Sequence, residues 1–216
     1  MHASSSGARI VVADLLAQGA NVNNVDNELW TPLTIASQNG HALVVDTLIE
    51  ANADVNLAPN NGTTALYTAS QYGHIRIVEA LVVARANVDQ PRNDGSTPLG
   101  VASQMGNATV IDALIAAGAN VNATSRVGNT PLMASLKSNK PQIVQKLLSK
   151  GANANAAAID GSTILMRAAG QGNIDIVRLL VEAGANCKIR MPTVYNALLI
   201  AEHSGHADIA AYLRSL

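Results

Sequence analysis

The sequence contains no phenylalanine, one tryptophan, four tyrosines and a single cysteine among its 216 residues. Because one thiol cannot form an internal disulfide, the fold is not predicted to depend on disulfides, which fits a reducing compartment. With aromatic residues at 2%, the core must be built from alanine, leucine, isoleucine and valine. Side chains of this size favour closely packed helices over one large globular interior.

Charge and long apolar runs are also scarce. Charged residues make up 13% of the chain, and 14 basic residues nearly balance 15 acidic ones. Nucleic-acid binding usually needs a basic stripe or a high pI, whereas the pI here is about 6.5. No apolar run approaches the roughly 18–20 residues that span a bilayer, and the first residues do not form a signal-peptide pattern. We therefore expect a monomeric, non-secreted chain of the cytoplasm or nucleus that binds neither nucleic acid nor membrane.

One motif recurs every 33 residues without insertion. Its first landmark falls at Thr31, Thr64, Thr97, Thr130, Thr163 and Asn196. An alanine follows five residues later in every copy except the fourth, which has Ser135. A glycine stands four residues further on, again with one exception, Asn139. Six copies in one register predict a repeat array.

The third copy shows how one repeat folds. Thr97 is suited to the N-cap of a helix and Pro98 to its first position, and Gly106 can end that helix in the left-handed conformation. The apolar residues of 110–115 form the stripe of a second helix, which Gly118 ends. The residues that follow are rich in turn formers and predict a hairpin loop. One such repeat cannot bury its stripe alone, so stacked repeats are expected to form an all-α solenoid.

These residues resemble the ankyrin repeat. The resemblance is carried by DGSTPLGVASQMGNATVIDALIAAGANVN (94–122) and ELWTPLTIASQNGHALVVDTLIEANADVN (28–56) and covers almost the whole chain. It implies a single ankyrin repeat domain over 1–216, an alpha-alpha solenoid. The expected repeats are 1–25 (partial), 26–58, 59–91, 92–124, 125–157, 158–190 and 191–216, the last serving as C-terminal cap.

Two further departures from the pattern bear on the structure. Arg85 stands where a glycine should end the second helix, and a positive φ there predicts strain of about 1 kcal/mol. Cys187 replaces a hairpin valine and is expected to be a buried small side chain.

No catalytic, cofactor or metal site is expected. His41, His74 and His206 occupy one position of different repeats, and helices packed about 8–10 Å apart cannot bring them to one metal ion. The segment EHSGH (202–206) has two histidines but no clear third ligand. There is no phosphate-binding glycine motif and no defensible nucleophile triad. We therefore predict a non-enzymatic chain in which these histidines are structural.

In ankyrin domains, hairpin tips and first helices line a concave groove that binds partner proteins, and the resemblance implies the same here. The partner-binding candidates are Trp30, Gln38, Asn39, Tyr72, Met105, Arg126, Lys137 and Tyr195. The wider set of groove positions includes the hairpin residues Asp94, Val127 and Ile159. The partners would be one or more proteins that the sequence does not identify.

Trp30 has two interpretations. Four of its five equivalents in other repeats are polar, so the fold does not require a large ring there, which favours contact with a ligand. However, Ile35 follows five residues later, which is the spacing of a hydrophobic staple. Tyr195 and Ile200 have the same spacing. Both interpretations stay open.

The charges are segregated along the chain. No lysine or arginine lies between Ile10 and Ile75, and no aspartate or glutamate lies between Ala113 and Ile159. One interpretation is drift among solvated residues. The other is a bipolar surface that orients a partner and speeds encounter.

Two other functions remain open. The chain could be a structural spacer or targeting segment of a larger protein whose activity lies elsewhere. It could also be a substrate, because ankyrin domains can be hydroxylated on hairpin asparagines. The matching positions are Asn23, Asn56, Asn122 and Asn155.

Overall fold

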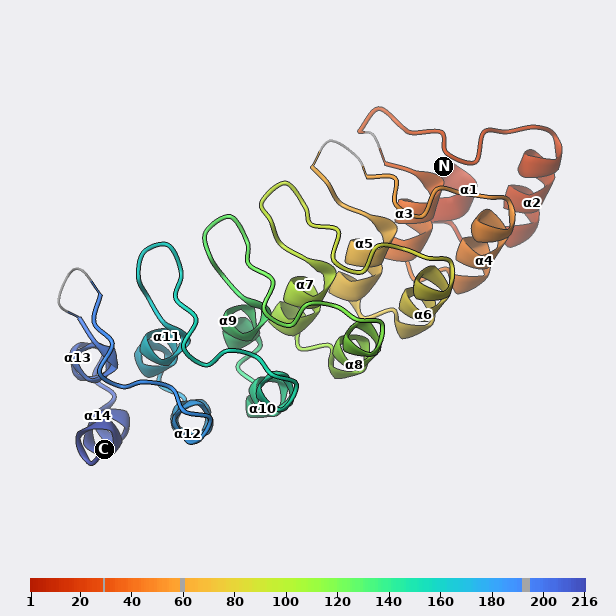
Figure 1. Ribbon diagram of the computed structural model, residues 1–216. Coiled ribbons are helices and arrows are strands. Elements are labelled where there is room, and N and C mark those ends of the chain that lie inside the picture. Colours follow the sequence, from red (N-terminus) through yellow and green to blue (C-terminus); the bar gives the residue numbers. More distant parts are fainter. Residues whose placement is uncertain (29, 59–60, 192–194) are drawn as a thin grey trace. The chain divides into compact units, whose positions relative to one another are not determined.

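The computed structural model describes residues 1–28, 30–58, 61–191 and 195–216 (Figure 1). It divides into two compact units, Met1–Asn120 and Val121–Leu216, called here the N-terminal and C-terminal units. Over the described ranges the regular structure is helical apart from one isolated bridge between Ala157 and Thr163. The predicted all-α architecture is confirmed. None of the helices in these ranges has the length and apolar character required to span a bilayer.

The N-terminal unit consists of four helix pairs. The first helices of the pairs are α1 (His2–Ser5), α3 (Pro32–Gln38), α5 (Ala65–Tyr72) and α7 (Pro98–Met105). The second helices are α2 (Arg9–Ala17), α4 (Ala42–Glu50), α6 (Ile75–Val83) and α8 (Ala108–Ala116). Within this unit the first helices lie next to the hairpin loops, and the second helices lie on the other side (Figure 1).

The C-terminal unit continues the pattern with three pairs. They are α9 (Pro131–Ser135) with α10 (Pro141–Ser149), α11 (Ile164–Gln171) with α12 (Ile174–Glu182), and α13 (Ala197–His203) with α14 (Ala207–Arg214). Helix α9 has 5 residues where α7 has 8, and a 3-10 turn, η1 (Leu136–Ser138), completes it. Ser135 and Ser138 donate hydroxyl hydrogen bonds back to Leu132 O and Ser135 O, which competes with regular helix bonding.

The helix ends form as the sequence predicts. Thr97 Oγ1 accepts the Gly100 amide at 3.1 Å, and the other four repeat threonines cap their helices in the same way. Gly106 ends α7 with φ 71°. Arg85 adopts φ 66° and Asn139 φ 50°, so both replace glycine at a left-handed position. The backbone strain expected at Arg85 therefore has its geometric basis.

The core is made of small and aliphatic side chains. In the N-terminal unit, Ala36, Ala69 and Ala102 are fully buried on the first helices, where they let α3, α5 and α7 approach closely. Leucines and valines of both helices fill the remaining space, each full burial contributing about 1.5–3 kcal/mol. The chain therefore builds a dense interior without phenylalanine.

The hairpins are tied to one another by hydrogen bonds between repeats. At the tips, the Asn93 amide donates to Asn61 O at 3.0 Å. At the bases, Asn56 Oδ1 accepts the Asn87 amide at 2.7 Å. Equivalent base contacts are made by Asn23, Asp89, Asn122 and Asn155. The asparagines of the hydroxylation hypothesis are therefore structural links between repeats.

Cys187 differs from the prediction. Its side chain is half-buried at the base of the last hairpin rather than fully buried, and its thiol donates weakly to Ala185 O at 3.7 Å. This partial burial is nevertheless enough to raise the pKa of the thiol.

Candidate protein-binding surface

The ends of the first helices bring several predicted residues together in the N-terminal unit. Asn39, Tyr72 and Met105 occupy the same position at the ends of α3, α5 and α7. These helices pack side by side, so the three side chains follow one another along one surface. Tyr72 is 51% exposed and Met105 47%, and Asn39 is also exposed. Two large side chains that the core does not use therefore lie on this surface.

Tyr72 is held in place by its neighbours. Gln38 Nε2 donates to the Tyr72 hydroxyl at 3.4 Å. The Tyr72 ring stacks on His74 with a centroid distance of 6.2 Å and an interplanar angle of 18°. Because the ring is already ordered, binding through it would lose little side-chain entropy.

Trp30 lies in the first hairpin, where its backbone is fixed by Asp26. Asp26 Oδ1 accepts the Trp30 amide at 2.8 Å, and the Asp26 amide donates to Trp30 O at 3.1 Å. The side chains of Trp30 and Ile35 are both half-buried, which fits the staple as well as the ligand contact. Among the described residues, the bonds found for Trp30 are those of its backbone.

The three candidates of the C-terminal unit are exposed but are not joined to one another. Arg126 lies at a hairpin tip, Lys137 lies in η1, and Tyr195 precedes α13. The Tyr195 ring meets His203 edge to face at a centroid distance of 5.4 Å. In the part of the chain that the structure describes, no hydrogen bond or ring contact links Tyr195 to the other two.

The hairpin tips of the same unit carry two exposed apolar side chains, Val127 and Ile159. The Ile159 amide donates to Val127 O at 3.1 Å, so the two tips are adjacent. Arg126 immediately precedes Val127, which adds a cation to this apolar pair. These tips therefore form a candidate contact surface of the C-terminal unit.

Contacts of a single arginine, Arg92, stiffen a hairpin of the N-terminal unit, and the sequence did not predict them. The Arg92 guanidinium lies 5.2 Å from the centroid of the buried Tyr67 ring and donates to its hydroxyl at 3.5 Å. That hydrogen bond raises the pKa of Arg92. Arg92 also lies 3.8 Å from Asp94, whose carboxylate accepts two hydrogen bonds from Ser96. The only signal in the sequence was Tyr67, an aromatic residue at a position that is usually small or aliphatic.

The C-terminal unit contains a similar arginine arrangement. Arg167 donates to Ser162 Oγ at 2.9 Å and to Asn129 Oδ1 at 2.7 Å. The hydroxyl and amide of Ser162 donate to Asp160, which lowers the pKa of that carboxyl. Both arginines therefore fix hairpin geometry, and each leaves its tip presented to solvent.

The repeat histidines have a structural role, as expected. His41 Nε2 lies 2.9 Å from Ser5 O and His74 Nε2 lies 3.1 Å from Gln38 O. In the C-terminal unit, His206 Nε2 lies 3.1 Å from Gly170 O. Each ring thus bonds to the end of the preceding first helix and sets the spacing of consecutive repeats. Among the described residues, no three His, Cys, Asp or Glu side chains are grouped so as to hold a metal ion.

Comparisons with known proteins agree with this geometry. A family model described as ankyrin repeats (3 copies) matches residues 1–92, 77–158 and 153–216. Among solved structures, the crystal structure of the human ASB11 ankyrin repeat domain is similar to this chain with a TM-score of 0.87 and 27% sequence identity. The similarity covers 98% of this chain and 96% of that one. A search of the curated proteins finds no match.

Proposed function

Because this chain belongs to the ankyrin repeat family, we propose that it is a non-catalytic module that binds a partner protein through its hairpin tips and first-helix ends. Ankyrin repeats are generally protein–protein interaction modules, and the family is generally non-enzymatic.

One observation carries it. Tyr72 and Met105 expose about half of their surface on consecutive first helices, although Asn39 stands at the same position. The fold therefore does not need large side chains there. Tyrosine and methionine are enriched in protein interfaces, and removing their apolar surface from water favours association. Gln38 supplies a hydrogen-bonding group beside Tyr72, and Trp30 is a further candidate contact in the first hairpin. Within the C-terminal unit, taken by itself, the proposed contacts are Val127, Ile159, Arg126, Lys137 and Tyr195.

We also propose that the repeats of 1–216 act as one domain, that the chain is monomeric and that it resides in the cytoplasm or nucleus. The unpaired Cys187 supports a reducing compartment. A single unfolding transition, a monomer mass in sedimentation and cell fractionation would test these points in turn.

The main test compares capture of proteins from a lysate of the source cells by three baits. They are the wild-type chain, Tyr72→Ala/Met105→Ala and the control Val11→Ala/Leu43→Ala, which removes exposed apolar side chains from second helices. We expect a protein that the wild type and the control retain and the first variant loses. Equal retention by all three baits would refute this contact surface. The absence of any specific capture would favour the alternative of a structural spacer or targeting segment.

A further inference from the structure

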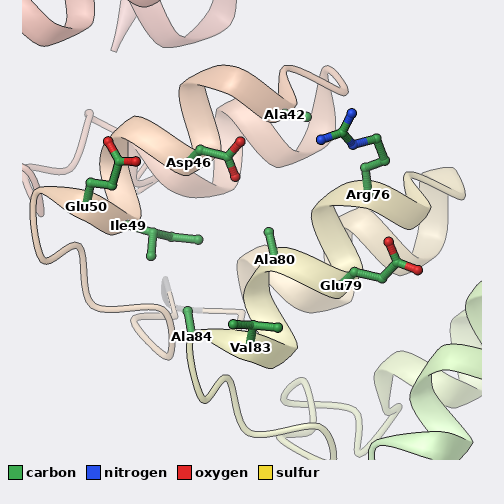
Figure 2. Close-up of a pocket in the computed structure, with 9 residues that line it drawn as sticks. All are labelled: Ala42, Asp46, Ile49, Glu50, Arg76, Glu79, Ala80, Val83 and Ala84. Atoms are coloured by element: carbon green, nitrogen blue, oxygen red, sulfur yellow. The ribbon is translucent and has the colours of Figure 1, made fainter.

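A groove lies between the second helices α4 and α6 of the N-terminal unit (Figure 2), which lie on the side of this unit away from the hairpin loops (Figure 1). Its volume is about 490 Å³. Ile49 of α4, Ala80 of α6 and Ala84, which directly follows α6, form its apolar part. Because the two alanines are small, the outer sides of the helices do not fill the space between them. The groove is therefore a consequence of local side-chain size.

Carboxylates dominate the rim of this groove. Asp46 and Glu50 lie one turn apart on α4, and Glu79 comes from α6. Figure 2 shows the Asp46 carboxylate directed toward the space between the two helices. Arg76 is the cation of the lining, and within the described ranges it forms no ion pair with these three residues. The rim thus carries three negative charges and one positive charge.

The surroundings add two cations to the rim. Arg9 of α2 donates to Thr47 Oγ1 on α4 at 3.3 Å, and Arg85 directly follows Ala84. The sequence between Ile10 and Ile75 contains acidic residues but no lysine or arginine. Val83, at one end of the groove, is 81% exposed, so an apolar side chain stands beside the carboxylates without a partner. An acidic rim around apolar surface is complementary to a segment that has the opposite charge and its own apolar side chain.

We propose that the α4–α6 groove is a second docking site, which binds a partner-protein segment carrying lysine or arginine beside an apolar side chain. The cations pair with Asp46, Glu50 and Glu79, and the apolar side chain covers Ile49, Ala80 and Val83. The groove shares no residue with the surface around Tyr72 and Met105. The chain can therefore hold two partner segments at the same time.

The first test is an NMR titration of the ¹⁵N-labelled full chain with the acetylated, amidated peptide KLKKLK at low salt. We expect amide shifts at Glu50, Glu79 and Val83, weakening of binding as salt is added, and no shifts with the peptide ELEELE. Shifts centred on Tyr72 and Met105 would overturn the proposal. The same is true if KLKKLK produces no shift, or if ELEELE binds equally well.

Charge variants distinguish peptide binding in the groove from non-specific attraction of the cationic peptide to other acidic residues. Glu50→Gln/Glu79→Gln should weaken KLKKLK binding about fivefold, which is the scale of two exposed ion pairs. Asp14→Asn/Glu28→Gln makes the same charge change at exposed positions outside the groove and should leave affinity within about twofold. Equal weakening in both variants would overturn the proposal.

The apolar contribution needs its own variant, Val83→Ser, which leaves the charges unchanged. It should weaken KLKKLK binding about threefold because the peptide leucine loses apolar contact. Unchanged affinity would contradict a groove that recognises both the charges and the apolar side chain of the peptide.

Sedimentation of the free chain completes the test, because self-association lost in Glu50→Gln/Glu79→Gln would assign the groove to a second copy instead. The failure of any of these tests leaves the proposal for Tyr72 and Met105 untouched.

Discussion

Leu15 and Leu48 occupy the same position of consecutive second helices, yet Leu15 is 43% exposed and Leu48 only 1%. Helix α2 packs against α4, whereas among the described residues no second helix of a preceding repeat packs against α2. We predict that Leu48→Ala lowers the free energy of unfolding by about 3 kcal/mol and Leu15→Ala by about 1 kcal/mol. Urea denaturation of both variants measures the difference. Equal losses would show that Leu15 is covered in solution.

The hairpin asparagines should contribute to stability. Asn56→Ala removes the acceptor of the Asn87 amide and should cost about 1–2 kcal/mol. Asn24→Ala is the matched control, because Asn24 is exposed and its side chain accepts no amide from a neighbouring repeat over the described ranges. Thermal unfolding of the two variants gives the comparison. A cost at Asn24 as large as that at Asn56 would contradict the proposed link.

Arg85 should be replaceable by glycine with a gain in stability. Its φ of 66° costs an L-residue energy that glycine avoids, so Arg85→Gly should stabilise the chain by about 0.5–1 kcal/mol. The preceding Ala84 has φ −76°, so Ala84→Gly should be destabilising by about 0.5–1 kcal/mol. Chemical denaturation of both variants measures whether the free energy of unfolding rises for Arg85→Gly and falls for Ala84→Gly. If Arg85→Gly also destabilises the chain, the arginine must make a compensating interaction.

Asp94 should make stability depend on acid pH. Burial acts to raise the pKa of its carboxyl, but the hydrogen bonds from the Ser96 side chain and amide lower it overall. A lowered folded-state pKa stabilises the protein above the ordinary value of 3.8, and this contribution is lost as pH falls through the folded value. Melting temperatures at pH 6 and pH 3 should therefore differ less for Asp94→Asn than for the wild type. Identical pH dependence of the two chains would remove Asp94 as a cause.

Cys187 should react slowly with alkylating reagents. Burial raises the pKa of its thiol, so less thiolate is present at pH 8 than in a free cysteine. Its rate of reaction with iodoacetamide should be below that of glutathione and should rise to a similar value in urea. A native rate equal to that of glutathione would contradict the partial burial.

Local features were predictable because they depend on residues close together in the chain. The cap of Thr97 needs only the amide of Gly100, and the end of α7 needs only the freedom of Gly106 to adopt positive φ. Arg85 could be assigned a positive φ because its place in the 33-residue period is unambiguous. The candidate site was predictable only in part. The sequence could place Tyr72 at a helix end but could not show that Gln38 and His74 hold its ring.

The sequence by itself determined the repeat, its helices and caps, and the positions that form the core, since these follow from a period and from interactions within one turn. The tertiary structure decided which side chains remain exposed and which meet across repeats. Leu15 and Leu48 occupy equivalent positions of two repeats, but their exposed fractions differ because a preceding second helix packs against α4 and, among the described residues, none packs against α2 in this way. The α4–α6 groove likewise depends on side chains from two helices, about one period apart, that only packing brings together.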